Sequence, residues 1–328
     1  MKSFACDVCG HTLYFENSVC VHCDSRVGYV RDARQMRARG ESAPCHNLRV
    51  SGCNWIPEDG EKFCFACRLT RTRPSDADVE GLDQYWTAEK SKRRLVFELD
   101  ELGLPIVPRV GDRGLAFDLL SSVKENVVTG HADGVITLDL AESDIVHREQ
   151  LRLDLDEPYR TMLGHFRHEI GHYYEQVLVQ GSSFEDRCRE LFGDERADYQ
   201  AALDRHYQHG APDDWQKSYI SKYATMHPWE DFAETFAHVL HIRDSLQTAA
   251  EFGLTVPAAI EAMRFSDVVV GIWIPLSIAL NQINRSMGKE PLYPFVLAPP
   301  VVAKLQLVAD VINDTRRRHV EDGSLART

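Results

Sequence analysis

A short run of histidines around one glutamate holds the most informative chemistry of this chain. His168, Glu169 and His172 form an H-E-x-x-H pattern. Residues four apart on a helix lie on the same face, so both imidazoles can bind one Zn²⁺. The carboxylate of Glu169 would lie beside the ion, where it can take a proton from water on the metal. The pattern therefore predicts a zinc site that activates water.

The sequence around the pattern predicts an amphipathic helix that starts near residues 156–158, where an acidic cap precedes a proline. Its apolar face is formed by Leu163, Phe166, Ile170, Tyr174 and Val177. His165, His168 and His172 lie on nearly the opposite face. Because His165 precedes the pair by a turn, we expect it to support a ligand or to face substrate.

A catalytic zinc site needs three protein ligands and one open position, so a third ligand must come from elsewhere. A second amphipathic helix is predicted to start at Pro228, and Glu230, Glu234, His238 and His241 share one of its faces. With Glu230 as the ligand, Glu234 can accept a hydrogen bond from a ligating histidine. In the reverse register, Glu234 binds the metal and His238 supports it. We favour Glu230 and keep both registers open.

Eight of the nine cysteines lie before residue 68 and predict two further metal sites. The first set has the spacing of two short knuckles around one tetrahedral Zn²⁺, with a strand between them at residues 11–15; its members are Cys6, Cys9, Cys20 and Cys23. The second set contains one tight pair, and its members are Cys45, Cys53, Cys64 and Cys67. His46 could replace one thiolate of the second set.

Four thiolates leave no open coordination position, so both cysteine sites are predicted to be structural. The segment has few aliphatic residues, and the metal should therefore supply folding free energy. A basic stretch within it could bind a protein or nucleic-acid partner, or could simply be a solvated face; it consists of Arg26, Arg31, Arg34, Arg37 and Arg39.

The net charge of -13 is unevenly distributed along the chain. Residues 1–95 contain 15 Lys/Arg and 13 Asp/Glu, whereas residues 96–328 contain 22 and 37. The larger part would repel a polyanion, which makes nucleic acid an unfavourable partner. The chain starts without an apolar signal segment, and the longest apolar stretch, Val268 to Leu280, is short for a bilayer and contains Pro275. We expect a cytoplasmic protein without a membrane segment, where clustered cysteines bind metal.

Between the cysteine-rich head and the histidine motif, the sequence predicts a helix over residues 80–103 and strands over 116–120 and 134–140. The alternation in the second strand is typical of a sheet edge. Beyond residue 255 the chain reads as helical and apolar.

The segment from Glu230 to Phe236, which follows the H-E-x-G-H of the first helix, resembles the glutamate-zincin arrangement of the lethal-factor-like metallopeptidases. The resemblance implies that Glu230 binds zinc, that Glu234 supports a histidine, and that a tyrosine seven residues before Glu230 helps to stabilise the tetrahedral intermediate. Tyr223 stands at that position. The whole chain is also similar to bacterial proteins called putative zinc-binding metallopeptidases, through its cysteine-rich head and the segments 160–169, 192–195 and 284–288.

From these observations we predict an α+β protein. A zinc ribbon with one or two structural zinc sites covers residues 1–75, a connecting helix covers 76–95, and a mostly helical zincin-like domain with a small β-sheet covers 96–328. The expected activity is hydrolysis of a peptide or protein substrate at one catalytic zinc, with Glu169 as general base and with Tyr223, or His227, as the oxyanion donor. The alternative is a non-catalytic adaptor that binds a protein or nucleic acid through the zinc ribbon.

Overall fold

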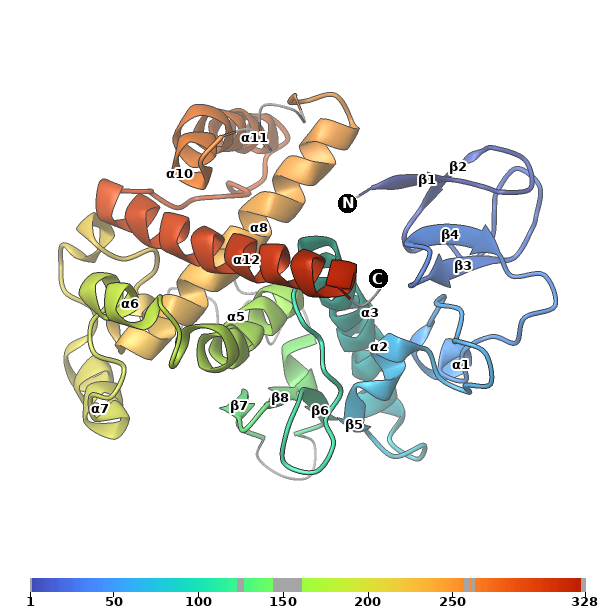
Figure 1. Cartoon of the computed structure of the whole chain (residues 1–328), viewed down its shortest axis with the longest axis horizontal. Coiled ribbons are helices and arrows are strands. Elements are labelled where there is room, and N and C mark those ends of the chain that lie inside the picture. The colour runs from blue at the N-terminus through green and yellow to red at the C-terminus, as the bar shows by residue number, and fades with distance from the viewer. Residues whose placement is uncertain (1, 123–126, 144–160, 257–259, 261–262, 326–328) are drawn as a thin grey trace. The chain divides into compact units, whose positions relative to one another are not determined.

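The computed structural model describes residues 2–122, 127–143, 161–256, 260 and 263–325 (Figure 1). Its contacts divide the chain into two compact units. The first unit comprises Met1–Phe97, Ile106–Ile145 and Gln247–Leu254. The second comprises Glu98–Pro105, Val146–Leu246 and Thr255–Thr328. The fold class is α+β, as predicted, with a zinc-ribbon region followed by a mostly helical part.

The cysteine-rich head is built from two short antiparallel hairpins and two single-turn helices. The hairpins pair β1 (Ser3–Ala5) with β2 (Thr12–Tyr14), and β3 (Val27–Val30) with β4 (Gln35–Ala38). The helices are α1 (Leu48–Ser51) and α2 (Phe65–Arg68). The strand expected between the first two cysteine pairs is therefore confirmed as β2.

The head has an aromatic core that is completed by the following helix. That helix, α3 (Val79–Leu102), confirms the prediction for residues 80–103. The rings of Phe15, Tyr29 and Trp55 pack within 4.8–6.0 Å of one another. Phe97 of α3 adds its ring at 4.7 Å from Phe15 and 5.4 Å from Tyr29. Aromatic burial therefore supplements what metal binding contributes to folding here.

A four-stranded sheet also belongs to the first unit. Its strand order is β5 (Thr70–Thr72), β6 (Ala116–Leu120), β8 (Val135–Asp139) and β7 (Gly130–Ala132). Along the chain, the short helix η1 (Leu140–Ser143) follows β8. The two predicted strands are present as β6 and β8. The prediction that the second lies at the sheet edge is wrong, because β7 pairs with it in antiparallel register and takes the edge.

The second unit is helical. The motif helix is α5 (Met162–Tyr174), which continues as the π-helical turn η2 (Glu175–Val179). Residues 156–158 lie outside the described residues, but the start predicted there is wrong for this helix, because Thr161 has extended backbone and caps it. The helix predicted from Pro228 is α8 (Pro228–Glu251). The remaining elements are α6 (Glu185–Phe192), α7 (Tyr199–His209), η3 (Trp215–Lys217), η4 (Tyr223–Thr225), α10 (Phe265–Val268), η5 (Val269–Trp273), α11 (Ile274–Ser286) and α12 (Pro299–Leu325).

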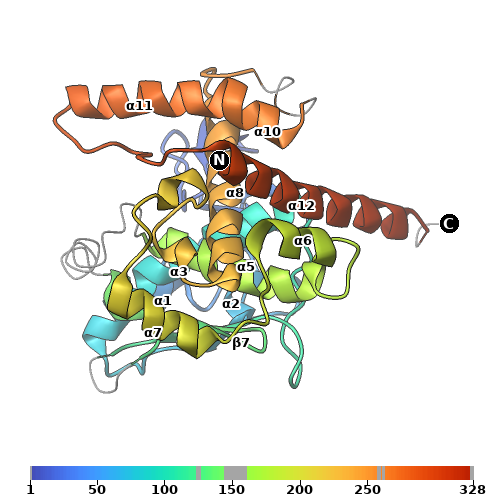
Figure 2. The same ribbon diagram turned by 90° about the vertical axis from the view of Figure 1, so that its left-hand side faces the viewer.

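The apolar stretch of the second unit is longer as a helix than the sequence suggests. Elements α10, η5 and α11 form one continuous rod over Phe265–Ser286 (Figure 2). Its 22 residues include a window of mean hydropathy 1.4, so the rod is long and apolar enough to cross a membrane. The helix thus extends beyond the predicted apolar stretch, Val268 to Leu280, at both ends. Length and composition alone are weak support for a membrane segment.

Candidate metal centre

The motif histidines are placed by a well-defined helix start. Thr161 caps α5, because its hydroxyl accepts a hydrogen bond from the backbone N–H of Gly164 at 3.0 Å. From this start, His168 and His172 fall one turn apart on the same face. Both imidazoles are largely buried, with side-chain exposures of 12% and 6%.

Gly171 allows the motif helix to approach α8 closely. A Cβ atom at this position would lie 2.9 Å from Ala233 Cα and 3.2 Å from Phe236 Cβ. Ordinary packing has no room for such a contact, so only glycine permits this separation of the two backbones. The close approach brings the histidine face of α5 against the acidic first turn of α8.

Three ligand atoms converge where the two helices meet. Glu230 Oε2 lies 3.0 Å from His168 Nε2 and 3.3 Å from His172 Nε2, and the two nitrogens are 3.2 Å apart. A tetrahedral Zn²⁺ with bonds of about 2.0–2.1 Å has ligand-to-ligand edges of roughly 3.3 Å. The triangle therefore has the dimensions that a zinc ion requires.

The hydrogen bond on the far side of His168 fixes its ring for metal binding. Glu234 accepts a hydrogen bond from His168 Nδ1 at 2.7 Å, and a carboxylate can only accept. This bond keeps a proton on Nδ1, so Nε2 is the ring nitrogen that would offer its lone pair to a metal ion in the triangle. Burial would raise the pKa of Glu234, but its bond to His168 outweighs this and lowers the pKa to about 2. In the structure, Glu230 Oε2 therefore lies with the two imidazole nitrogens as a candidate ligand, and Glu234 lies behind His168.

Glu169 is the carboxylate beside the triangle that no described residue satisfies. Its side chain is 7% exposed, and Oε2 has no hydrogen-bond partner among the described residues. Burial raises the pKa of this group, while the charges of His168 and His172 offset part of the effect. A buried carboxylate with a raised pKa and an unused oxygen is suited to accept a proton from a water molecule.

One tyrosine at the site has no signal in the sequence. The hydroxyl of Tyr199, the first residue of α7, donates a hydrogen bond to Glu230 Oε1 at 2.9 Å. This bond holds one carboxylate oxygen and leaves Oε2 for the metal. Burial, together with the charge of Glu230, raises the pKa of Tyr199, which keeps its hydroxyl protonated as a donor. Tyr199 lies 31 residues before Glu230, and no periodicity links the two positions.

The other predicted site residues occupy four different settings. Tyr223 lies near the triangle, with its ring centroid 5.9 Å from that of His168. His227 instead caps α8, because Nδ1 accepts from the backbone N–H of Trp229 at 3.1 Å and Nε2 donates to Ala197 O. His165 is half-buried one turn before Glu169. His238 lies farther along α8, where it is hydrogen-bonded to the hydroxyl of a tyrosine.

Three buried ion pairs anchor the helices that carry the candidate ligands. Arg167, next to His168, donates to Glu98 Oε2 at 3.0 Å and to Asp244 Oδ2 at 2.9 Å. Asp231, next to Glu230, binds Lys304 Nζ of α12 at 2.5 Å. Each pair is almost fully buried, so removing one partner would leave an uncompensated charge in the core. The ligands are therefore held on rigid elements.

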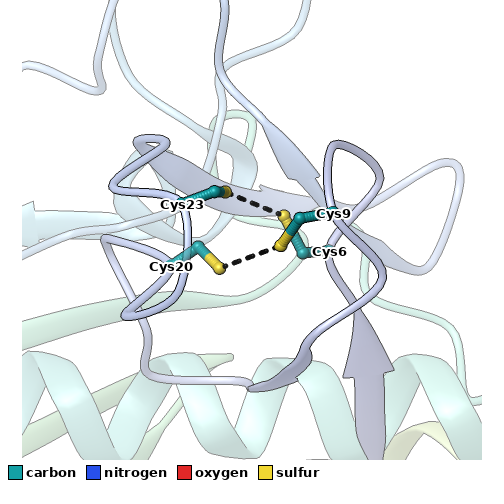
Figure 3. A group of neighbouring side chains, drawn as sticks. All are labelled: Cys6, Cys9, Cys20 and Cys23. Atoms are coloured by element: carbon teal, nitrogen blue, oxygen red, sulfur yellow. Dashed lines mark hydrogen bonds between the residues drawn. The ribbon is translucent and has the colours of Figure 1, made fainter.

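The cysteines form two separate groups in the first unit. Cys6 and Cys9 face Cys20 and Cys23 from a second loop, with sulfur separations of 3.7–3.8 Å (Figure 3). A tetrahedral zinc with Zn–S bonds of about 2.3 Å has edges of roughly 3.8 Å. The described cysteines form no disulfide.

The second cysteine group also brings four thiols together. Cys45, Cys53, Cys64 and Cys67 converge within 4.8 Å and are all buried. The His46 ring is exposed and packs near Phe63. The structure therefore offers four sulfur ligands here without His46.

Comparison with known proteins assigns the chain. A family model described as "Putative zinc-binding metallo-peptidase" matches residues 81–311. The chain belongs to this family. A second model, for a zinc-ribbon domain, matches residues 3–78.

Proteins similar to the whole chain occur in mycobacteria. Uncharacterized proteins of Mycobacterium tuberculosis (strain ATCC 25618 / H37Rv) and Mycobacterium bovis (strain ATCC BAA-935 / AF2122/97) are 52% identical to the chain over 328 residues, covering 96% of each sequence. No solved structure matches the chain. The family and the zinc-ribbon head, both predicted from the sequence, are confirmed.

Proposed function

We propose that this protein is a zinc-dependent metallopeptidase that hydrolyses peptide bonds. The observation that carries the proposal is the convergence of three ligand atoms, from two helices, beside a buried carboxylate. His168, His172 and Glu230 would hold one zinc ion, and Glu169 would serve as the general base. An ion in this position would act as a Lewis acid and lower the pKa of a water molecule to about 7.

The remaining steps belong to the side chains of the protein. Glu169 Oε2 accepts the proton of the attacking water and then passes it to the leaving amine. The hydroxyl of Tyr223 donates a hydrogen bond to the oxyanion that develops on the peptide carbonyl. Glu234 and Tyr199 keep His168 and Glu230 in position throughout. Because His227 uses both ring nitrogens on the backbone, we assign the oxyanion role to Tyr223 alone.

Glu169→Gln is the direct test of this function. The amide has nearly the same shape but cannot accept the proton, so we expect peptide hydrolysis to fall by about 10²–10⁴-fold while zinc content is unchanged. The measurement is a digest of a peptide library followed by mass spectrometry, with wild type and variant compared. Cleavage by E169Q at the wild-type rate would refute the assignment, and a wild-type protein that cleaves nothing would favour the adaptor alternative.

Tyr223→Phe tests the oxyanion donor separately. Removal of one such donor typically lowers turnover by roughly 10²–10³-fold. We expect the loss in kcat with KM little changed, because the hydroxyl acts on charge that appears only in the transition state. Steady-state kinetics on a peptide found in the library digest would measure both constants. An equal loss confined to KM would contradict this role.

The proposal also specifies the metal content and the setting. We infer three zinc ions per chain, one at the histidine site and one in each cysteine group. The substrate would be a peptide or protein, nucleic acid and membranes are not expected partners, and the cytoplasm is the expected location.

A further inference from the structure

The head contains a pocket that plays no part in the proposed chemistry. Its volume is about 260 Å³, and all of its lining residues belong to the first unit. Its polar lining includes Arg26, Arg39, Asn54 and Trp55. The apolar lining includes Val19, Val27, Pro44 and Leu48.

Two residues in the lining of this pocket carry a buried donor group that has no acceptor among the described residues. The side chain of Trp55 is 2% exposed, and its indole N–H has no hydrogen-bond partner among the described residues. The same holds for the buried Nε–H of Arg39. Indole and guanidinium groups donate but never accept. A buried donor without a partner costs free energy, so the pocket is matched to a ligand that brings acceptor oxygens.

The two pocket arginines also lack a counter-charge. Over the described parts of the chain, no carboxylate lies within 4.0 Å of the guanidinium of Arg26 or Arg39. Their neighbour in the basic stretch, Arg31, instead stacks over the ring of Phe65 at 3.5 Å. The structure therefore separates the predicted basic stretch into a stacked arginine and two arginines that line a pocket.

The neighbouring cysteine group does not use the charge of these arginines. Cys45 and Cys53 line the same pocket, and zinc-bound thiolates would carry negative charge. The buried Lys92 and Arg93 of α3 interact electrostatically with these cysteines, and their positive charges would balance the thiolates. The positive charge of Arg26 and Arg39 is thus available to a ligand.

The walls of the pocket are held before any ligand binds. The Asn54 side chain donates to Phe15 O at 2.6 Å and to Asn17 O at 3.0 Å. The backbone N–H of Arg39 donates to Arg26 O at 2.8 Å, which holds the two arginines side by side just outside the paired strands β3 and β4. A preformed wall lowers the ordering cost of binding.

We propose that this pocket binds a carboxylate carried next to an apolar group, as at the C-terminus of a peptide that ends in an apolar residue. The arginines and the indole N–H would hold the carboxylate, and the apolar lining would take the last side chain. The choice of a peptide over other anions rests on the proposed function, since a peptidase must hold peptide chains. The head would then select substrates by their ends.

The test measures binding of an acetylated tetrapeptide ending in leucine to the full-length, zinc-loaded E169Q chain by calorimetry. We expect binding with the free carboxylate and at least about tenfold weaker binding with the C-terminal amide. R39Q and R26Q, each in the E169Q background, should weaken binding by a similar factor. R37Q is the matched control, because Arg37 is an exposed arginine of the same head that does not line the pocket.

Several results of the binding test would overturn the proposal. Equal binding of acid and amide, equal losses in R37Q and R39Q, or no binding at all would remove the carboxylate site. Arginine-dependent binding of inorganic phosphate or a single-stranded oligonucleotide in preference to the peptide would assign the pocket to a phosphate ligand. Zinc content and circular dichroism check folding, and the exposed Arg26 keeps the test valid if R39Q unfolds. Binding without any wild-type hydrolysis would uphold the pocket and refute the peptidase.

Discussion

Glu230→Ala is expected to remove the zinc ion of the histidine site and to leave the two cysteine sites filled. The carboxylate contributes the ligand atom that lies 3.0 Å and 3.3 Å from the two imidazole nitrogens. Without it only two ligands remain. Loss of a residue that only hydrogen-bonds to a metal ligand typically lowers metal affinity about 10–100-fold. Loss of a ligand itself should therefore lower it at least about 100-fold.

Elemental analysis after dialysis against a mild chelator would measure this effect as a fall from three zinc ions per chain to two. Glu234→Gln is the comparison, because it changes the group behind His168 and leaves the ligand set intact. We expect it to weaken zinc binding by roughly 10–100-fold, a smaller loss than that of E230A. If E234Q empties the site and E230A does not, the reverse register is correct.

Gly171→Ala is expected to destabilise the protein and to disturb the metal site, although alanine is the better helix former. The gain in helix propensity is about 1 kcal/mol. Against this, the new Cβ would lie 2.9 Å from the backbone of Ala233, and overpacking of this kind costs about 1–3 kcal/mol. Because the contact is with backbone, relief requires α5 and α8 to move apart, which separates the ligands.

Denaturant unfolding and zinc affinity would measure the two parts of this effect. Gly271→Ala is a matched control, since Gly271 also lies in a helical segment but has nothing within 4 Å of its Cβ position. We expect G271A to keep zinc binding and to gain up to about 1 kcal/mol. A G171A protein as stable as G271A, with unchanged zinc affinity, would show that close approach of the helices is not required.

The parts of the site that follow from local spacing were predictable from the sequence. His168 and His172 are one helical turn apart, and the same rule separates Glu230 from Glu234. Periodicity likewise predicts the helices now seen as α3 and α8, and the strands β6 and β8. Each of these features is decided by residues within one element, where a fixed geometry links spacing to position.

The parts that depend on pairing between distant residues were not predictable in this way. The hydrogen bond from Tyr199 to Glu230 joins two different helices, and no fixed sequence spacing relates the two residues. The edge of the sheet was misplaced because the three-residue strand β7 carries no alternating pattern of its own. The pocket arginines belong to the same basic stretch as Arg31 and Arg37 and cannot be distinguished from them in the sequence. Only the tertiary structure shows which of them line the pocket.

The aromatic core of the head has a consequence for dissecting the protein. A fragment cut after residue 75 would keep all eight clustered cysteines and both sets of metal ligands. It would nevertheless lose Phe97, whose ring closes over Phe15 and Tyr29, and those two rings would then face water. An isolated ribbon should therefore self-associate through this bare aromatic face, and a fragment extended through Leu102 should not.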